Sequence, residues 1–161
     1  MRFVGNDVLR AVVDTNVWVP AVLNPAGFPA RILEAFVAGR FVVVTNELLL
    51  DELGDVLRRP RIARRYGIAE ADVAALVSFL RHHAAIVEIF GEIKLCRDPD
   101  DDVVIETALR GDADALVSRD EDLARAPGLE AALRQLGVEV LTVQRFINLL
   151  ANESEVSDLS S

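Results

Sequence analysis

Phe41-Val42-Val43-Val44 is a short run that is apolar at every position, and Thr45 and a helical pattern over 47–58 follow it directly. β-Branched residues favour extended backbone, and a continuously apolar run is typical of a strand that is covered on both faces. Strands of this kind that alternate with amphipathic helices are typical of α/β proteins. The stretch therefore predicts an α/β fold with a largely parallel sheet.

The same alternation continues on both sides of this unit. Short apolar runs predict strands over 11–13, 41–44, 85–88, 115–117 and 138–141. Helical spacing of apolar residues predicts helices over 30–38, 47–58, 70–83, 101–109, 129–136 and 143–150. Gly39, Gly111 and Gly137 each follow a helical pattern, where a left-handed residue commonly ends a helix. We expect residues 1–150 to form one domain and residues 151–161 to form a disordered acidic tail.

Composition limits the classes of protein to consider. The 161 residues are 52% apolar, which is enough to bury a substantial core, and the net charge of −9 argues against a basic nucleic-acid coat protein. Cys96 is the single cysteine, so no intrachain disulfide can form and a reducing compartment is favoured. No signal-peptide core and no apolar run of about 18 residues is present, so we expect a cytoplasmic protein without a membrane partner.

Polar residues follow several of the predicted strands. Asp14 comes directly after the run 11–13, Thr45 directly follows the run 41–44, and Ser118 and Asp120 follow the run 115–117. In open α/β sheets, ligand sites form outside the carboxyl ends of the strands. These side chains are therefore expected to lie along one edge of the sheet.

One carboxylate interrupts the apolar stripe of the predicted helix 47–58. Glu52 lies three residues after Leu49 and four before Val56, so all three are expected on one face of the helix. A buried carboxylate needs a partner or a metal ion, so Glu52 is a candidate ligand. The other acids of this helix recur on the opposite face and are expected to be solvated: Glu47, Asp51 and Asp55.

A dense acidic run, Asp98-Pro99-Asp100-Asp101-Asp102, opens the next predicted helix. Most of it is explained by the chemistry of helix starts, because its first two residues suit the N-cap and the first helical position, and first-turn acids favour the helix dipole. Asp101 differs, since it stands four residues before Ile105 and seven before Ala108 and extends the inward stripe. Asp101 is therefore the candidate ligand of the run.

Carboxylates gathered at one edge of a sheet imply a cation. Two carboxylates about 5 Å apart repel by roughly 3 kcal/mol at an effective dielectric constant of about 20. Such a cluster protonates, spreads apart or holds a cation. Oxygen ligands suit Mg²⁺ or Mn²⁺ rather than zinc, and the only two histidines, His82 and His83, are adjacent on a helix and cannot face one site together.

Arginines gather in one segment of this acidic protein. Of the 17 basic residues 16 are Arg, and five of them lie within 58–65. A planar guanidinium suits phosphate, so Arg58, Arg59 and Arg61 are candidates for contacts with an RNA backbone. A solvated helix end is the other interpretation, and the sequence leaves both open.

Four motifs in order resemble the PIN-domain ribonucleases, and in particular the VapC-like toxin components of bacterial and archaeal toxin–antitoxin pairs. The likeness spans residues 9–150 and rests on Val13-Asp14-Thr15-Asn16, Thr45 followed by Glu52, Arg97-Asp98-Pro99-Asp100-Asp101-Asp102, and Val117-Ser118-Arg119-Asp120. The resemblance implies a three-layer α/β/α sandwich and an endoribonuclease that depends on Mg²⁺ or Mn²⁺. It implies that Asp14, Glu52, Asp101 and Asp120 are the catalytic metal ligands.

The resemblance also implies supporting residues and partners. Asn16 and Thr45 match the family's small polar positions, Ser118 lies beside the fourth acid, and Asp122 is an alternative to Asp120. The expected partners are an RNA substrate, a cognate antitoxin and a second copy of the chain. Trp18, Phe28 and Phe146 are apolar residues that a dimer surface could use, and Trp18 and Phe28 are also candidates for the core.

Three other functions compete with the toxin hypothesis. The first is an RNA-processing nuclease with the same chemistry and no antitoxin, and the second is a catalytically silent interaction module. The third is a phospho-receiver domain, which also clusters acids on a parallel sheet but needs a pair of acids after the first strand and a lysine near the last. Here Thr15-Asn16 follows Asp14, and Lys94 is the only lysine, so the receiver reading is disfavoured.

Overall fold

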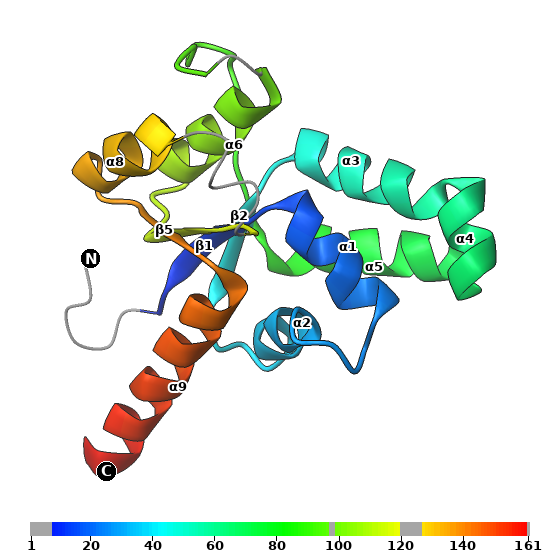
Figure 1. The fold of residues 1–161 in the computed structure, drawn as a ribbon, viewed down its shortest axis with the longest axis horizontal. Helices are drawn as coiled ribbons and strands as arrows, with labels where there is room; N and C mark the ends of the chain where they lie inside the picture. The colour runs from blue at the N-terminus through cyan, green and yellow to red at the C-terminus, as the bar shows by residue number, and fades with distance from the viewer. Residues whose placement is uncertain (1–7, 97–98, 120–126, 161) are drawn as a thin grey trace.

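A parallel sheet forms the centre of the structure, a computed structural model that describes residues 8–96, 99–119 and 127–160. Within these residues the sheet has five strands in the order β3-β2-β1-β4-β5 (Figure 1). The strands are β1 (Arg10–Val13), β2 (Val42–Thr45), β3 (Ala85–Ile86), β4 (Ala115–Val117) and β5 (Glu139–Leu141). The sequence prediction of a parallel α/β sheet is confirmed.

Helices cover both faces of this sheet, which makes the fold a three-layer α/β/α sandwich. They are α1 (Thr15–Leu23), α2 (Ala30–Val37), α3 (Glu47–Arg58), α4 (Pro60–Tyr66), α5 (Glu70–His83), α6 (Pro99–Arg110), α8 (Pro127–Gln135) and α9 (Val143–Ser160). None of the described helices is both long and apolar enough to pass through a membrane.

Alternate strand residues supply two separate apolar cores. Val13 and Val43 belong to the larger core, which α1, α2, α3, α5 and α9 complete. Val12 and Leu116 point to the other face and pack with residues of α6 and α8. Because successive side chains of a strand face opposite ways, a strand buried on both faces is apolar at every position. This is the pattern from which the sheet was predicted.

Two of the three residues considered for a dimer surface lie in the larger core. Trp18 is 4% exposed and packs edge-on against Phe36, with ring centroids 6.2 Å apart. Phe146 is fully buried and packs against Phe41 at 4.9 Å. Phe28 is 37% exposed and is the one of the three that reaches the surface.

Two helices were missed by periodicity. α1 contains Pro20 in its interior and is rich in β-branched residues, both poor helix formers, and it is held by the burial of Val17, Trp18 and Ala21. α4 has Pro60 at its first position and Gly67 in the left-handed conformation (φ 64°) after its end. That Pro-to-Gly spacing was a readable signal for a short helix.

The C-terminal segment and one glycine also differ from expectation. α9 continues to Ser160, through the stretch expected to be a disordered tail, because no Gly or Pro interrupts it and Phe146 and Leu150 anchor its first turns. Gly39 and Gly137 have the expected positive φ, but after α6 it is Asp112, not Gly111, that takes it (φ 53°). A Cβ on Gly111 would collide with the side chain of Val44 and lie 2.9 Å from Thr107 O, so this glycine serves close packing.

Candidate metal centre

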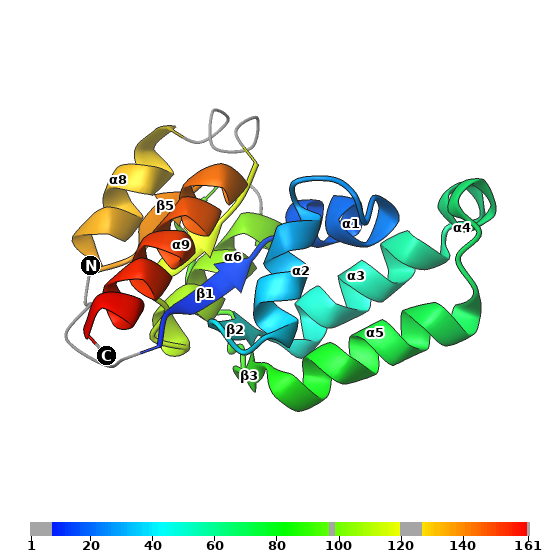
Figure 2. The ribbon, with the colours of Figure 1, turned by 90° about the horizontal axis from the view of Figure 1, so that it is seen from below.

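The first candidate ligand lies where the order of the strands reverses. β1 is central and pairs with β2 on one side and with β4 on the other. The carboxyl end of β1 leads directly into α1 (Figure 2), and Asp14 occupies the junction as the N-cap residue of that helix. Its backbone N–H donates to Val117 O at 3.0 Å, which ties the junction to the end of β4. Such a switch point is where open α/β sheets form their ligand sites.

The carboxylate of Asp14 is held in an environment that disfavours its charge. Burial raises the pKa of this carboxyl above its ordinary value, although the Ser118 hydroxyl, which donates to Asp14 Oδ2 at 3.2 Å, and the Thr15 backbone N–H oppose the shift. The nearby carboxylates of Glu52 and Asp101 raise the pKa further by repulsion. Both partners predicted from distant segments therefore act electrostatically on Asp14. A divalent cation would relieve this repulsion.

Glu52 reaches the site from α3, but it is not buried as the sequence suggested. Its side chain is exposed, and Thr15 Oγ1 donates to Glu52 Oε2 at 3.2 Å. The buried face of α3 is formed by Leu49, Leu50, Leu53, Gly54 and Leu57. The neighbouring Leu48 is 57% exposed, so the apolar stripe is rotated from the predicted face and Glu52 lies at its border. At this border a carboxylate can remain hydrated while facing the end of β1.

Asp101 and Asp102 have different environments. Asp102 Oδ1 accepts hydrogen bonds from the backbone N–H groups of Leu95 at 2.9 Å and Cys96 at 2.8 Å, so this carboxylate fastens the segment that precedes α6. Asp101 is exposed rather than directed into the core, and it acts on the pKa of Asp14. Asp101 was expected to continue the inward stripe of α6, and it is instead exposed, although close enough to Asp14 to act on its pKa.

The acidic cluster of the described residues is open. No three His, Cys, Asp or Glu side chains within 8–96, 99–119 and 127–160 converge tightly enough to hold a metal ion by themselves. Asp120 and Asp122, the predicted fourth ligand and its alternative, lie outside the described residues. An open oxygen cluster still fits Mg²⁺, which keeps several waters and takes few protein carboxylates. Ser118, a predicted supporting residue, lies beside Asp14 and donates to its carboxylate.

The other two supporting residues lie at the ends of their strands. Thr45 is 5% exposed at the end of β2, and its backbone oxygen accepts from the Val87 N–H at 2.8 Å. Asn16 is half-buried in the first turn of α1, two residues after Asp14. Both therefore sit at the carboxyl edge of the sheet, where the sequence placed them.

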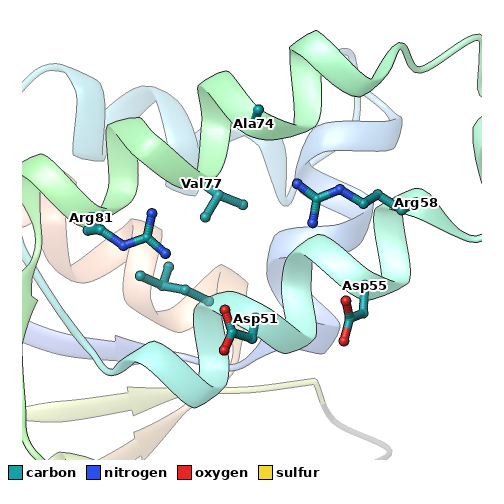
Figure 3. A pocket seen from close by; sticks show the side chains of 7 residues that line it. Asp51, Asp55, Arg58, Ala74, Val77 and Arg81 are labelled. Carbon is teal, nitrogen blue, oxygen red and sulfur yellow. The ribbon is translucent and has the colours of Figure 1, made fainter.

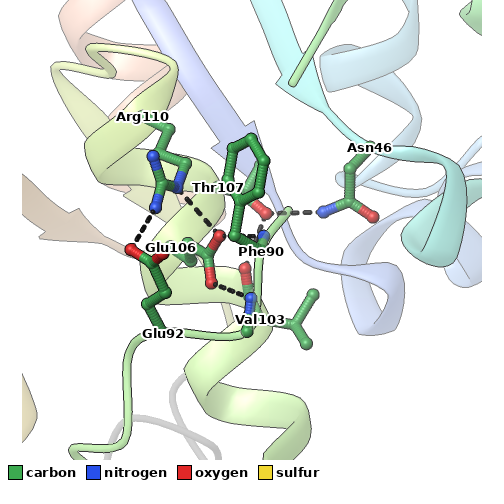
Figure 4. Close-up of polar contacts among 8 residues, drawn as sticks. Asn46, Phe90, Glu92, Val103, Glu106, Thr107 and Arg110 are labelled. Carbon is green, nitrogen blue, oxygen red and sulfur yellow. Dashed lines mark hydrogen bonds and ion pairs between the residues drawn. The ribbon is translucent and has the colours of Figure 1, made fainter. Parts of the chain in front are cut away.

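A buried amide that the sequence analysis missed joins the two helices that carry acids. Asn46 is 1% exposed, and its Oδ1 caps α3 by accepting from Leu49 N at 3.0 Å. Its Nδ2 donates to Thr107 Oγ1 at 2.6 Å, and that hydroxyl donates to Val103 O in α6 at 2.6 Å (Figure 4). Asn followed by Glu at a helix start is an N-cap signal, so Asn46 was recognisable as a cap, but its link to α6 was not.

A second buried carboxylate, Glu106, lies in α6 and was also missed. It is 1% exposed and accepts from Phe90 N at 2.6 Å, from Gly91 N at 3.0 Å and from Arg110 Nε at 2.9 Å (Figure 4). The Phe90 N–H is the largest cause that lowers the pKa of this carboxyl, and Arg110 adds to it against the effect of burial. Glu106 therefore fastens the segment 87–96 to α6 as a stably ionised group.

A hollow of about 450 Å³ between α3 and α5 lies apart from the acidic edge (Figure 3). Its charged lining residues are Asp51, Asp55, Arg58 and Arg81. Arg58 pairs with Glu70 at 2.9 Å and Arg81 with Glu47 at 3.0 Å, and the lining residue Asp51 also attracts Arg81 electrostatically. Because charges of both signs alternate along it, this hollow lacks the uncompensated carboxylates that mark a metal centre.

Comparison with known proteins identifies a family for most of the chain. The family described as PIN domain matches residues 10–122, a segment that includes β1 to β4 and every predicted metal ligand. An uncharacterized protein of Methanocaldococcus jannaschii, MJ1680, is 29% identical over 121 residues, which are 71% of this chain and 77% of that protein.

Proposed function

Because this chain belongs to the PIN-domain family, whose members are metal-dependent nucleases that act on RNA, we propose that it is an endoribonuclease that hydrolyses RNA phosphodiester bonds at the acidic edge of its sheet. One observation carries the proposal. Asp14 lies at the switch point with a raised pKa, and Glu52 and Asp101 from two other helices both repel it. A fold that brings like charges together in this way gains from a bound cation.

The chain's own groups have separable roles in this proposal. Asp14, Glu52 and Asp101 hold the ion, and Asp120, or Asp122 in its place, completes the set. Ser118 and Thr15 orient two of the carboxylates through the hydrogen bonds described above. Asn16 and Thr45 are assigned to hydrogen bonds with a carboxylate or a phosphate oxygen. The ion, when bound, supplies Lewis-acid activation of water and neutralises charge on the phosphate.

The ligand chemistry favours Mg²⁺ or Mn²⁺. Every candidate ligand atom is a carboxylate, hydroxyl or amide oxygen, which is the donor set that these hard cations prefer. None of the candidate ligands is a thiolate or an imidazole, the ligands typical of structural zinc sites.

A cleavage assay on a single-stranded RNA tests the proposal. Wild-type protein should cleave in Mg²⁺ or Mn²⁺ and stop in EDTA. Glu52→Gln should slow cleavage by about 10–100-fold, because it weakens ion binding. Asp55→Asn is the matched control, since it removes one carboxylate from the same helix on the side that lines the α3–α5 hollow, and it should cleave normally. Cleavage that persists in EDTA would refute the proposal.

The toxin role is the finer part of the proposal. Its support is the resemblance of the four motifs to toxin components, which also suggests a homodimer and an antitoxin that covers the acidic edge. Expression of the wild-type chain should arrest bacterial growth, Asp14→Asn should not, and co-expression of an adjacent small reading frame should restore growth. Normal growth with an active enzyme would favour the RNA-processing nuclease without an antitoxin.

A further inference from the structure

α4 is a helix that contributes no buried residue to either core. This helix lies at the far end of the α3–α5 hairpin (Figure 2), and none of its residues is buried. Arg61, Arg64 and Arg65 are spaced three and four apart, so they share one face of the helix, and Arg59 precedes it. We call these four exposed residues the arginine tip. Arg64 and Arg65 lie in the last turn, where positive charge suits the helix dipole, but the spacing from Arg61 places three like charges on one face, where they repel one another.

The arginine tip differs from four other arginines of the described chain by its lack of carboxylate partners. Arg58, Arg81, Arg110 and Arg134 each form an ion pair with a glutamate at 2.9–3.0 Å. For the arginine tip, the described residues provide no ion pair within 4 Å. In a chain of net charge −9, the tip is thus a local positive surface whose guanidinium groups are available to an anion.

An exposed aromatic ring accompanies these cations. Tyr66 is 45% exposed, and the Arg65 guanidinium lies 5.4 Å from the centre of its ring. Proteins that bind single-stranded nucleic acid combine cations for the phosphates with aromatic rings on which unpaired bases stack. An acidic protein segment would use the cations but has no need of the ring, so the combination favours RNA.

The tip is within reach of the acidic edge. Glu52 and Arg58 are six residues apart within α3, which corresponds to about 9 Å at 1.5 Å per helical residue, and α4 follows directly after Arg59. On the order of three stacked nucleotides span this part of the path. We propose that the arginine tip binds the backbone of single-stranded RNA a few nucleotides from the scissile phosphate. Arg58, which the sequence had grouped with Arg59 and Arg61, is left out because its guanidinium is held by Glu70. This inference rests on the proposed nuclease function.

RNA affinity, measured in the Asp14→Asn background so that no cleavage occurs, tests the tip directly. For a 12-nucleotide single strand, Arg61→Gln/Arg64→Gln should weaken binding by about tenfold and lower the slope of log K against log salt concentration by about 1.4, which corresponds to two phosphate contacts. Tyr66→Ala should weaken binding to a similar degree without changing the slope. Arg31→Gln/Arg134→Gln, which removes two exposed arginines elsewhere, is the matched control and should leave the slope unchanged.

Equal salt slopes for the Arg61/Arg64 variant and the control would overturn the inference. It would also be overturned if the Arg61/Arg64 variant lost binding to poly-glutamate but kept its affinity for RNA, because the arginine tip would then bind an acidic protein. In the active protein, the Arg61/Arg64 variant should cleave the 12-nucleotide RNA more slowly and a trinucleotide at the wild-type rate. If wild-type protein cleaves neither RNA, the nuclease proposal fails. The salt slopes of binding still show whether the arginine tip contacts RNA phosphates.

Discussion

Asp14 is partly buried and Glu106 is fully buried, and the surroundings of the two carboxyls shift their pKa in opposite directions. Glu106 receives two backbone N–H groups and a guanidinium, and its pKa is lowered. Asp14 has a hydroxyl and one N–H, faces two other carboxylates, and has a raised pKa. A carboxylate whose charge is satisfied by the protein itself fastens structure, whereas one whose charge is left unbalanced is a candidate for binding a cation.

Asp14→Asn tests this comparison with the largest expected effect. RNA cleavage should fall by at least about 100-fold, because a direct ligand of the proposed metal ion is lost. The metal-free variant should nevertheless have a higher Tm than wild type at pH 7. An acid whose pKa is raised by folding destabilises the folded state as the pH rises past its ordinary value of 3.8, so the gain should vanish below that pH. A lower Tm at pH 7 would show that Asp14 is a structural carboxylate like Glu106.

Asp101 and Asp102, which are adjacent in the first turn of α6, allow the same comparison between a metal-binding and a structural carboxylate. Asp101→Asn should reduce cleavage by about 10–100-fold and weaken Mn²⁺ binding. Asp102→Asn keeps an acceptor oxygen for Leu95 N and Cys96 N, so its activity should stay within about twofold of wild type. Isothermal titration with Mn²⁺ and single-turnover kinetics measure both. Equal losses in the two variants would remove the distinction between them.

Glu106→Gln should act on stability with the opposite dependence on pH. A pKa lowered by folding stabilises the protein above the ordinary value of 4.5, and this contribution is lost as the pH falls below it. The variant should melt several degrees below wild type at pH 7, with a difference that narrows in acid. Glu92→Gln, which removes an exposed partner of the same Arg110, should change Tm little. A pH-independent difference for Glu106→Gln would mean that packing and not charge is responsible.

The fold was more predictable than the site, for physical reasons. The apolar run 115–117 predicted the bounds of β4 correctly. A strand that is buried on both faces is apolar at every position, so it can be recognised from its own sequence without knowledge of its neighbours. Asp14 and Ser118 followed from their places at strand ends. The roles of Asn46 and Glu106 depend on Thr107, Phe90 and Gly91, which only the tertiary structure brings to them. The burial of Glu52 was misjudged because periodicity locates the centre of a helix face better than its border.

The pairing of β1 with β4 has a consequence for the chain while it is being synthesised. Asp14 and Ser118 are 104 residues apart in the sequence, so a ribosome releases Asp14 and Glu52 well before the strand that completes the neighbourhood of Asp14. Parallel pairing across such a separation forms late in folding. A nascent chain therefore carries its acids dispersed, and under the proposed nuclease function this delays activity until translation of its own messenger RNA has passed the last parts of the site.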